Sequence, residues 1–149
     1  MILTKRQNIL LLILIVFYWV GVIGLHTSFR ASFLTLTPFN LLLSFACLYL
    51  SFKDLSLKKH VDFFLIALAG YVIEWIGIHT SYLFGNYQYG SVLGFKFDGV
   101  PLIIGLNWVL LTFGASAIVN KWKIPLLLKA LVAGALMTAL DWLIEPVAV

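Results

Sequence analysis

Five long apolar segments, separated by short polar connections, dominate this chain of 149 residues. A helix needs about 20 mainly apolar residues to cross a bilayer, where the backbone must satisfy its own polar groups. Segments that meet this requirement lie at about residues 8–26, 33–52, 62–79, 100–119 and 124–144. The sequence therefore predicts an all-α, polytopic membrane helical bundle of about five transmembrane helices. We expect a single integral membrane domain over residues 1–149, with a loop or re-entrant segment between the third and fourth helices.

The composition excludes an ordinary soluble domain. Hydrophobic residues make up 62% of the chain and charged residues 11%, against roughly 45–50% and 25% in soluble domains. The net charge of +4 could suggest a nucleic-acid partner, but the basic residues lie between the apolar segments and not along one face. We therefore expect no nucleic acid to bind and interpret these residues as topology signals. The single cysteine, Cys47, cannot form an internal disulfide.

The basic residues predict the direction in which the helices run, because an excess of lysine and arginine marks the cytoplasmic side. A cytoplasmic N-terminus leaves only Arg30 and Lys96 on the opposite side. The sequence therefore predicts an integral protein of the cytoplasmic membrane whose N-terminus is cytoplasmic. The basic residues then on the cytoplasmic side are Lys5, Arg6, Lys53, Lys58, Lys59, Lys121, Lys123 and Lys129.

Acidic residues converge on the non-cytoplasmic end in this topology. Glu74 lies inside an apolar segment, where an ionisable side chain is costly and indicates a functional site by default. Asp141 and Glu145 are four residues apart, so they project from one helix face. Two carboxylates that close in apolar surroundings cannot both stay ionised, and a protonated carboxyl group can act as a general acid. Glu74, Asp141 and Glu145 are therefore the candidate catalytic residues.

Structural interpretations stay open for the same three residues. Glu74 could serve only to form a hydrogen bond between helices, while Asp141 and Glu145 could simply end their helix at the water interface. The residues that share a helix face with Glu74, by their three- and four-residue spacing, are Tyr71, Trp75 and Ile78.

An aromatic loop follows the third apolar segment. Residues 84–90 read Phe-Gly-Asn-Tyr-Gln-Tyr-Gly, and such a loop must rest in protein or at the interface, because lipid offers its backbone no hydrogen bonds. Its rings could form a belt at the headgroup level or line a pocket for a long unsaturated lipid. On the second interpretation the candidate substrate-binding residues are His79, Tyr82, Phe84, Tyr87, Tyr89, Asp98, Asn107 and Trp108.

Several chemical motifs are missing from the sequence. No Cys/His cluster has the spacing of a metal site, no Gly-rich loop with lysine follows a strand, and no Gly-x-Ser-x-Gly motif occurs. The sequence therefore predicts no metal site and no cofactor, and it leaves acid/base chemistry by carboxylates as the expected type of reaction.

Several motifs over about residues 70–146 together resemble a family of membrane proteins of carotenoid biosynthesis, which includes the bisanhydrobacterioruberin hydratase and the bacterial carotenoid 1,2-hydratases. The first motif is the run Thr80-Ser81-Tyr82-Leu83-Phe84-Gly85-Asn86-Tyr87-Gln88-Tyr89. The others are Leu93-Gly94, Gly99-Val100-Pro101, Trp108 and Asp141-x-x-x-Glu145-Pro146. The chain departs from the family at Ser81, where a glycine is expected, and this change should stiffen the turn. Members also tend to continue with further membrane segments after the Glu-Pro pair, so this chain is either a short member or lacks a C-terminal part.

The resemblance implies hydration of the terminal C1–C2 double bond of an acyclic carotenoid, such as a lycopene-type polyene, without a cofactor. From the placement of the residues, and not from the resemblance, we assign the proton donor to Asp141 or Glu145 and the water-activating carboxylate to Glu74, with Asp98, His79 and Asn107 as supporting polar groups. The expected partners are the carotenoid and membrane lipid, and the sequence leaves a homo-oligomer open.

Two other functions stay open. A non-catalytic carotenoid- or lipid-binding membrane subunit would use the aromatic loop as a docking site and the acidic residues for helix packing. An intramembrane prenyltransferase would need Asp-rich motifs on two helices to hold Mg²⁺ against a diphosphate. Only the Asp141-x-x-x-Glu145 pair approximates such a motif, so the prenyltransferase is the less favoured of the two.

Overall fold

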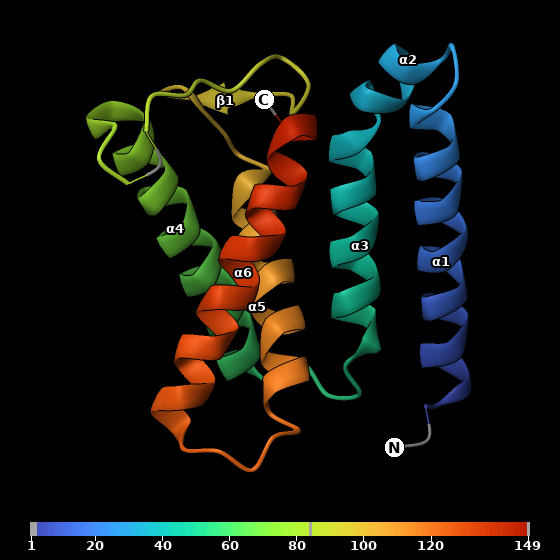
Figure 1. Cartoon of the computed structure of the whole chain (residues 1–149). Coiled ribbons are helices and arrows are strands. Elements are labelled where there is room, and N and C mark those ends of the chain that lie inside the picture. Colours follow the sequence, from blue (N-terminus) through green and yellow to red (C-terminus); the bar gives the residue numbers. More distant parts are fainter. Residues whose placement is uncertain (1–2, 84, 149) are drawn as a thin grey trace.

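The computed structural model describes the backbone of residues 3–83 and 85–148, and the side chains of residues 3–83 and 85–140. This described part consists of six helices and one short β-hairpin, which lies at the upper end of the bundle between α4 and α5 in the chain (Figure 1). The helices are α1 (Lys5–Leu25), α2 (Arg30–Thr35), α3 (Thr37–Ser51), α4 (Leu57–Thr80), α5 (Ile104–Val119) and α6 (Leu126–Ala148). The antiparallel strands of the hairpin are β1 (Lys96–Phe97) and β2 (Val100–Pro101).

The five predicted segments correspond to the five long helices, with two differences. The second segment is divided at Leu36, between α2 and α3, and Pro38 lies in the first turn of α3. Proline fits there because the first turn of a helix leaves its N–H groups without helical partners. The fourth predicted segment corresponds to α5, which begins at Ile104 and not near residue 100, because Val100 and Pro101 pair with β1. The described fold is therefore helical except for this hairpin, which the all-α prediction did not include.

Two helices, α1 and α4, are long and apolar enough to cross a membrane. Helices α3 and α5 and the stretch Leu126–Leu140 of α6 are apolar but shorter. Large apolar side chains cover the outer surface of α1, where Leu12, Trp19 and Ile23 are each more than half exposed. A continuous apolar surface of this kind suits lipid and not water. These features indicate that the protein associates with a membrane.

The two ends of the bundle differ in charge. The N-terminus, the α3–α4 connection and the α5–α6 connection lie at the lower end of Figure 1, while the α1–α2 turn and the hairpin lie at the upper end. Eight of the ten basic residues belong to the lower set of segments, and Arg30 and Lys96 to the upper set. The long helices therefore run alternately up and down, and the basic residues are concentrated at one end of the bundle. The orientation of this bundle in a membrane stays a prediction.

Helix α5 packs against α3, α4 and α6, and its contact with α4 is the most extensive in the described part of the bundle. Glycines allow this approach. A Cβ atom added at Gly70 would overlap the side chain of Trp108, and one added at Gly105 would lie 3.1 Å from the carbonyl oxygen of Ala67. Because both positions lack a side chain, the Trp108 ring can lie directly on α4.

The segment between α4 and α5 turns at residues with left-handed backbone angles. Helix α4 ends at Ser81, whose φ is 55°. Glycine is favoured at such an angle because it has no Cβ. The glycine that the family resemblance leads us to expect at position 81 would therefore adopt this turn with less strain than Ser81. The hairpin turns at Asp98 and Gly99, with φ of 46° and 84°, and positive φ at both central residues is typical of the tight type I′ turn.

A small core holds the hairpin on the helices. Leu93, Val100 and Ile104 are buried together, and Tyr71, Tyr89 and Trp108 are among the residues that pack against them. The loop that follows α4 therefore folds back across α4 and α5 and does not extend away from the bundle.

We predict that Gly70→Ala lowers the free energy of unfolding by about 1–3 kcal/mol, because an overpacked interface must shift to admit the methyl group. The matched control is Gly134→Ala in α6, where no atom lies within 4 Å of an added Cβ. This control should raise the helix stability by roughly 0.5–1 kcal/mol, since alanine is the better helix former. Melting temperatures of the detergent-solubilised variants provide the comparison, and equal values for the two variants would contradict the close contact.

Candidate functional site

Glu74 is the most unusual side chain of the bundle, since it is an acidic residue with only 5% of its surface exposed. Three hydrogen bonds converge on its carboxylate. Tyr87 and Tyr89 donate through Oη to Oε2 at 2.6 and 2.8 Å, and Trp108 donates through Nε1 to Oε1 at 3.1 Å. We call these three donors, together with Glu74, the Glu74 cluster. Both carboxylate oxygens therefore have hydrogen-bond partners.

Three separate parts of the chain assemble the Glu74 cluster. Glu74 comes from the last third of α4, Trp108 from α5, and the two tyrosines from the loop between these helices. Gly70, one turn before Glu74, leaves the space in which the Trp108 ring lies. Lys96 of β1 donates to the backbone carbonyl of Tyr89 and so fixes that part of the loop.

These hydrogen bonds offset the free-energy cost of burying the Glu74 carboxylate. Burial of a charge is costly unless it is paired and hydrogen-bonded, and bonds to a charged acceptor are stronger than bonds between neutral groups. Tyrosine hydroxyls can donate and accept hydrogen bonds, so a carboxylate that accepts from two of them lies in a hydrogen-bond network whose members strengthen one another. The rings of Tyr87 and Tyr89 meet edge to face, with centroids 5.5 Å apart, and so are held in place as well.

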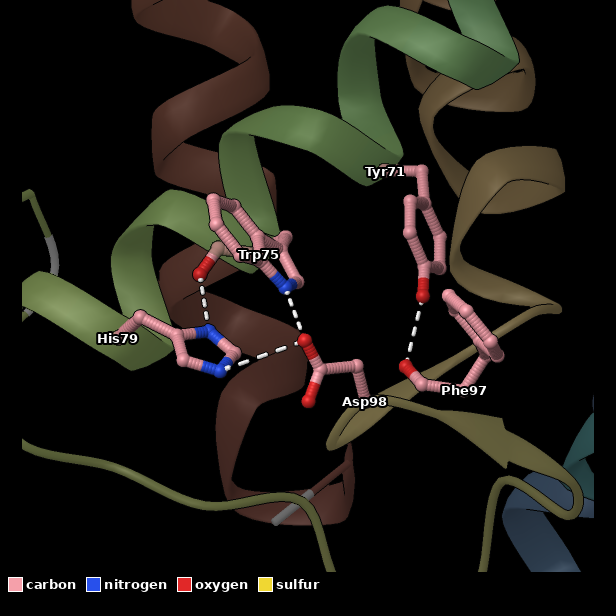
Figure 2. Close-up of polar contacts among 5 residues, drawn as sticks. All are labelled: Tyr71, Trp75, His79, Phe97 and Asp98. Carbon is pink, nitrogen blue, oxygen red and sulfur yellow. Dashed lines mark hydrogen bonds and ion pairs between the residues drawn. The ribbon is translucent and has the colours of Figure 1, made fainter.

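A second polar cluster lies on the neighbouring face of α4 (Figure 2). The indole Nε1 of Trp75 donates to Asp98 Oδ2 at 2.6 Å, and His79 Nε2 lies 3.6 Å from the same oxygen. His79 Nδ1 also lies 2.8 Å from the backbone carbonyl of Trp75, and Tyr71 Oη donates to the carbonyl of Phe97. The side chains of His79 and Asp98 are 39% and 56% exposed. This cluster therefore fastens the turn of the hairpin to α4 at a more open position than Glu74.

The structure brings together some of the predicted site residues and separates others. Glu74, Tyr87, Tyr89 and Trp108 form one cluster, and His79 and Asp98 belong to the second. The described donors to Glu74 are the two tyrosines and the tryptophan. The supporting role of His79, Asp98 and Asn107 in the site stays a prediction. Asn107 faces a different space, a groove between α1, α3 and α5.

Other predicted residues lie at the margin of the described site or outside it. Tyr82 is 92% exposed, just beyond the end of α4. Phe84 lies outside the described residues. Asp141 and Glu145 belong to helix α6, and their side chains lie outside the described ones. Their proposed catalytic role therefore stays a prediction.

Sequence reasoning assigned no role to two side chains that the structure places in the second cluster. Tyr71 and Trp75 were expected on the same helix face as Glu74, yet their hydrogen bonds go to the hairpin. The signal that could have found them is the dipeptide Asp98-Gly99, which is typical of a two-residue hairpin turn. Such a turn brings its polar residues back toward the preceding helix.

The segment that builds both clusters is also the segment that carries the family relationship. No curated protein and no solved structure matches the chain. The family model described as carotenoid biosynthesis protein matches residues 31–149, which include every residue of the two clusters. The chain therefore belongs to the carotenoid biosynthesis protein family.

Proposed function

We propose that the protein adds water across the terminal C1–C2 double bond of an acyclic carotenoid end, by acid/base catalysis with carboxylates. Membership of the family supports a role in carotenoid biosynthesis. The observation that carries the proposal is the buried Glu74 carboxylate, which accepts hydrogen bonds from Tyr87, Tyr89 and Trp108. The substrate is apolar and lies in the membrane, and the apolar surfaces of α1 and α4 suit a protein that meets it there.

The reaction begins with protonation. A carboxylic acid transfers its proton to C2, the π electrons of the C1–C2 bond form the new C–H bond, and a tertiary cation is left at C1. Water then attacks C1 through oxygen, and the second carboxylate accepts the proton that this water loses. The net change is one hydrogen at C2 and one hydroxyl at C1. No electrons are gained or lost, so the reaction requires no redox partner.

Glu74 is the proposed water-activating carboxylate. A fixed negative charge near C1 stabilises the developing cation, and such preorganised electrostatic stabilisation is a large contribution to catalysis. The rings of Tyr87, Tyr89 and Trp108 surround the carboxylate, and electron-rich aromatic faces also attract cations. Asp141 or Glu145 of α6 is the proposed proton donor, and proton exchange with solvent resets both carboxyl groups after each turnover.

The site has a proposed location in the membrane. Glu74 lies in the upper part of α4, at the end of the bundle that carries Arg30 and Lys96 and opposite the basic end. With a cytoplasmic N-terminus, hydration would take place in the outer half of the cytoplasmic membrane. Water reaches this depth more readily than the bilayer centre, which suits a reaction that consumes water.

We predict that Glu74→Gln reduces hydration by about 10²- to 10⁴-fold, the range associated with loss of a general acid or base. Hydroxylated product is measured by chromatography and mass analysis of pigment from a lycopene-producing host. The matched control is Asp62→Asn, on the same helix but 12 residues away, about 18 Å along the axis. Full activity of Glu74→Gln, with the protein present at its normal level in the membrane, would refute the assigned role.

We predict that Tyr87→Phe and Tyr89→Phe each reduce the rate by about ten- to a hundredfold, since a hydrogen bond to a charged group contributes roughly 1.5–3 kcal/mol. Both variants keep the aromatic ring and remove one donor to Oε2. Tyr49→Phe is the control, because the Tyr49 hydroxyl contacts His60 near the opposite end of the bundle. Equal rates for all three variants would show that the tyrosine donors do not act on Glu74 during the reaction.

A further inference from the structure

Three residues on one stripe of α4 face the β-hairpin. Tyr71, Trp75 and His79 are four residues apart, so their side chains leave the same side of the helix. Tyr71 Oη donates to the backbone of β1 at 2.7 Å, and Trp75 Nε1 donates to Asp98 Oδ2 at 2.6 Å. His79 Nε2 lies 3.6 Å from the same carboxylate oxygen (Figure 2). Of these three side chains, only that of histidine ordinarily changes charge between about pH 5 and 8.

The contact of His79 Nδ1 determines what Nε2 can do. Nδ1 lies 2.8 Å from the backbone carbonyl oxygen of Trp75, and a carbonyl oxygen can only accept, so Nδ1 carries a proton. In the neutral ring Nε2 then has a lone pair and no hydrogen. This lone pair faces Asp98 Oδ2, which is also an acceptor. Their separation of 3.6 Å is too long for a hydrogen bond, as expected for two acceptors that face each other.

A second proton on the ring changes this contact into an ion pair. Nε2–H then donates to Asp98 Oδ2, and a hydrogen bond between a cation and a carboxylate is shorter and stronger than one between neutral groups. The side chains of His79 and Asp98 are 39% and 56% exposed, so solvent can deliver and remove this proton. The hairpin turn is therefore held more firmly on α4 when His79 is protonated.

The charge on His79 acts on the hairpin through Asp98. In the described part of the chain, Asp98 is the acidic side chain that forms an ion pair with His79. The other titratable groups on the elements packed here are directed elsewhere. The hydroxyl of Tyr71 bonds to the backbone of β1, and Lys96 of β1 bonds to the carbonyl of Tyr89.

The hairpin connects this ion pair to the Glu74 cluster. Lys96 of β1 donates to the backbone carbonyl of Tyr89, and Tyr89 Oη donates to Glu74 Oε2 at 2.8 Å. Val100 of β2 is completely buried in the small core against which Tyr89 packs. A hairpin that is held on α4 therefore keeps Tyr89 in position to donate, and a hairpin that moves away from α4 loosens this donor.

The backbone at Asp98 provides a variant that separates the turn from its contacts. The φ of Asp98 is 46°, in a left-handed region that residues other than glycine rarely adopt. Such conformations persist where surrounding contacts hold them, and the described contacts of this side chain are those with Trp75 and His79. Asp98→Gly removes both contacts, while glycine suits the same backbone angle better. The turn should therefore form in this variant without being fastened to α4.

We propose that His79 and Asp98 are positioning residues whose ion pair, formed when His79 is protonated, fastens the hairpin to α4 and keeps the Tyr89 hydroxyl directed at Glu74. The inference rests on the proposed function for its effect on hydration, whereas the ion pair itself requires no substrate. Both residues act on Glu74 through the hairpin and Tyr89. The donor set of Glu74 is therefore better ordered on the acidic side of the range in which histidine titrates.

Each test variant removes one partner of the ion pair. His79→Gln is neutral at every pH, and Asp98→Gly has no carboxylate. The matched control is His26→Gln at the end of α1. His26 makes the same contact of Nδ1 with the carbonyl four residues earlier, that of Val22 at 2.8 Å. Unlike His79, it forms no ion pair in the described part of the chain.

Hydrogen–deuterium exchange of the detergent-solubilised protein, measured by mass spectrometry over residues 85–97, tests the ion pair without substrate. After correction for the intrinsic effect of pH on exchange, this segment of the unaltered protein should exchange roughly two- to fivefold more slowly at about pH 5 than at pH 8, since histidine titrates between these values and an exposed ion pair contributes modestly. His26→Gln should keep this difference. His79→Gln and Asp98→Gly should each exchange at one rate at both pH values.

The pH profile of hydration tests the effect on Glu74. The ratio of the lycopene hydration rate at about pH 5 to that at pH 8 should be roughly two- to fivefold higher in the unaltered protein and His26→Gln than in His79→Gln and Asp98→Gly. The acid/base steps are common to all four proteins, so their own pH dependence cancels in this comparison.

The two measurements together distinguish the ion pair from the reaction. Exchange that stays pH-dependent in both His79→Gln and Asp98→Gly, or that does not depend on pH in the unaltered protein, overturns the proposal. The expected exchange with the same pH profile of hydration in all four proteins also overturns it, because the ion pair then does not position Tyr89. The expected exchange in a protein that hydrates no carotenoid supports the ion pair and refutes the proposed function.

Discussion

The structure depends on one constraint, the burial of the Glu74 carboxylate between two apolar helices. A carboxylate in such surroundings is far more costly than in water unless donors replace its hydration. Helix α4 cannot provide these donors from its own backbone, whose N–H groups are used within the helix. They must come from elsewhere in the chain, and they come from Tyr87, Tyr89 and Trp108. The path of the loop after α4 follows from this requirement.

The other features of the upper end keep these donors in position. Trp108 reaches Glu74 because Gly70 has no side chain, and the tyrosines are held by the hairpin that follows them. The hairpin is in turn fixed by its tight turn at Asp98 and Gly99 and by the contacts of that turn with Trp75 and His79. The second cluster therefore acts as a positioning element for the first, although none of its members donates to Glu74.

Much of this arrangement was predictable from the sequence. Physical reasons explain why the rest was not. Apolar segments of the right length predict helices, and a lone glutamate within one predicts a buried polar site, so the helices and Glu74 were found. The structure places Tyr87, Tyr89 and Trp108 together at Glu74, but the sequence could not identify this shared hydrogen-bond partner. Hydrogen bonds between residues 13, 15 and 34 positions apart depend on how a loop folds back. Asn107 was expected among the site residues because it is a polar residue inside an apolar segment, next to Trp108. One residue along a helix, however, is a rotation of about 100°, which places it on the groove.

That rotation also suggests how one helix serves two spaces. The face of α5 that carries Trp108 contacts α4 and the carboxylate, while the face that carries Asn107 and Gly114 lines the groove. One helix therefore borders both a buried polar cluster and an apolar groove. If the two were one cavity, water that reached the carboxylate would also wet the apolar lining of the groove, and burial of that apolar surface would stabilise the bundle less. A wall formed by α5 and the small core, whose residues Leu93 and Ile104 also line the groove, keeps the two environments apart.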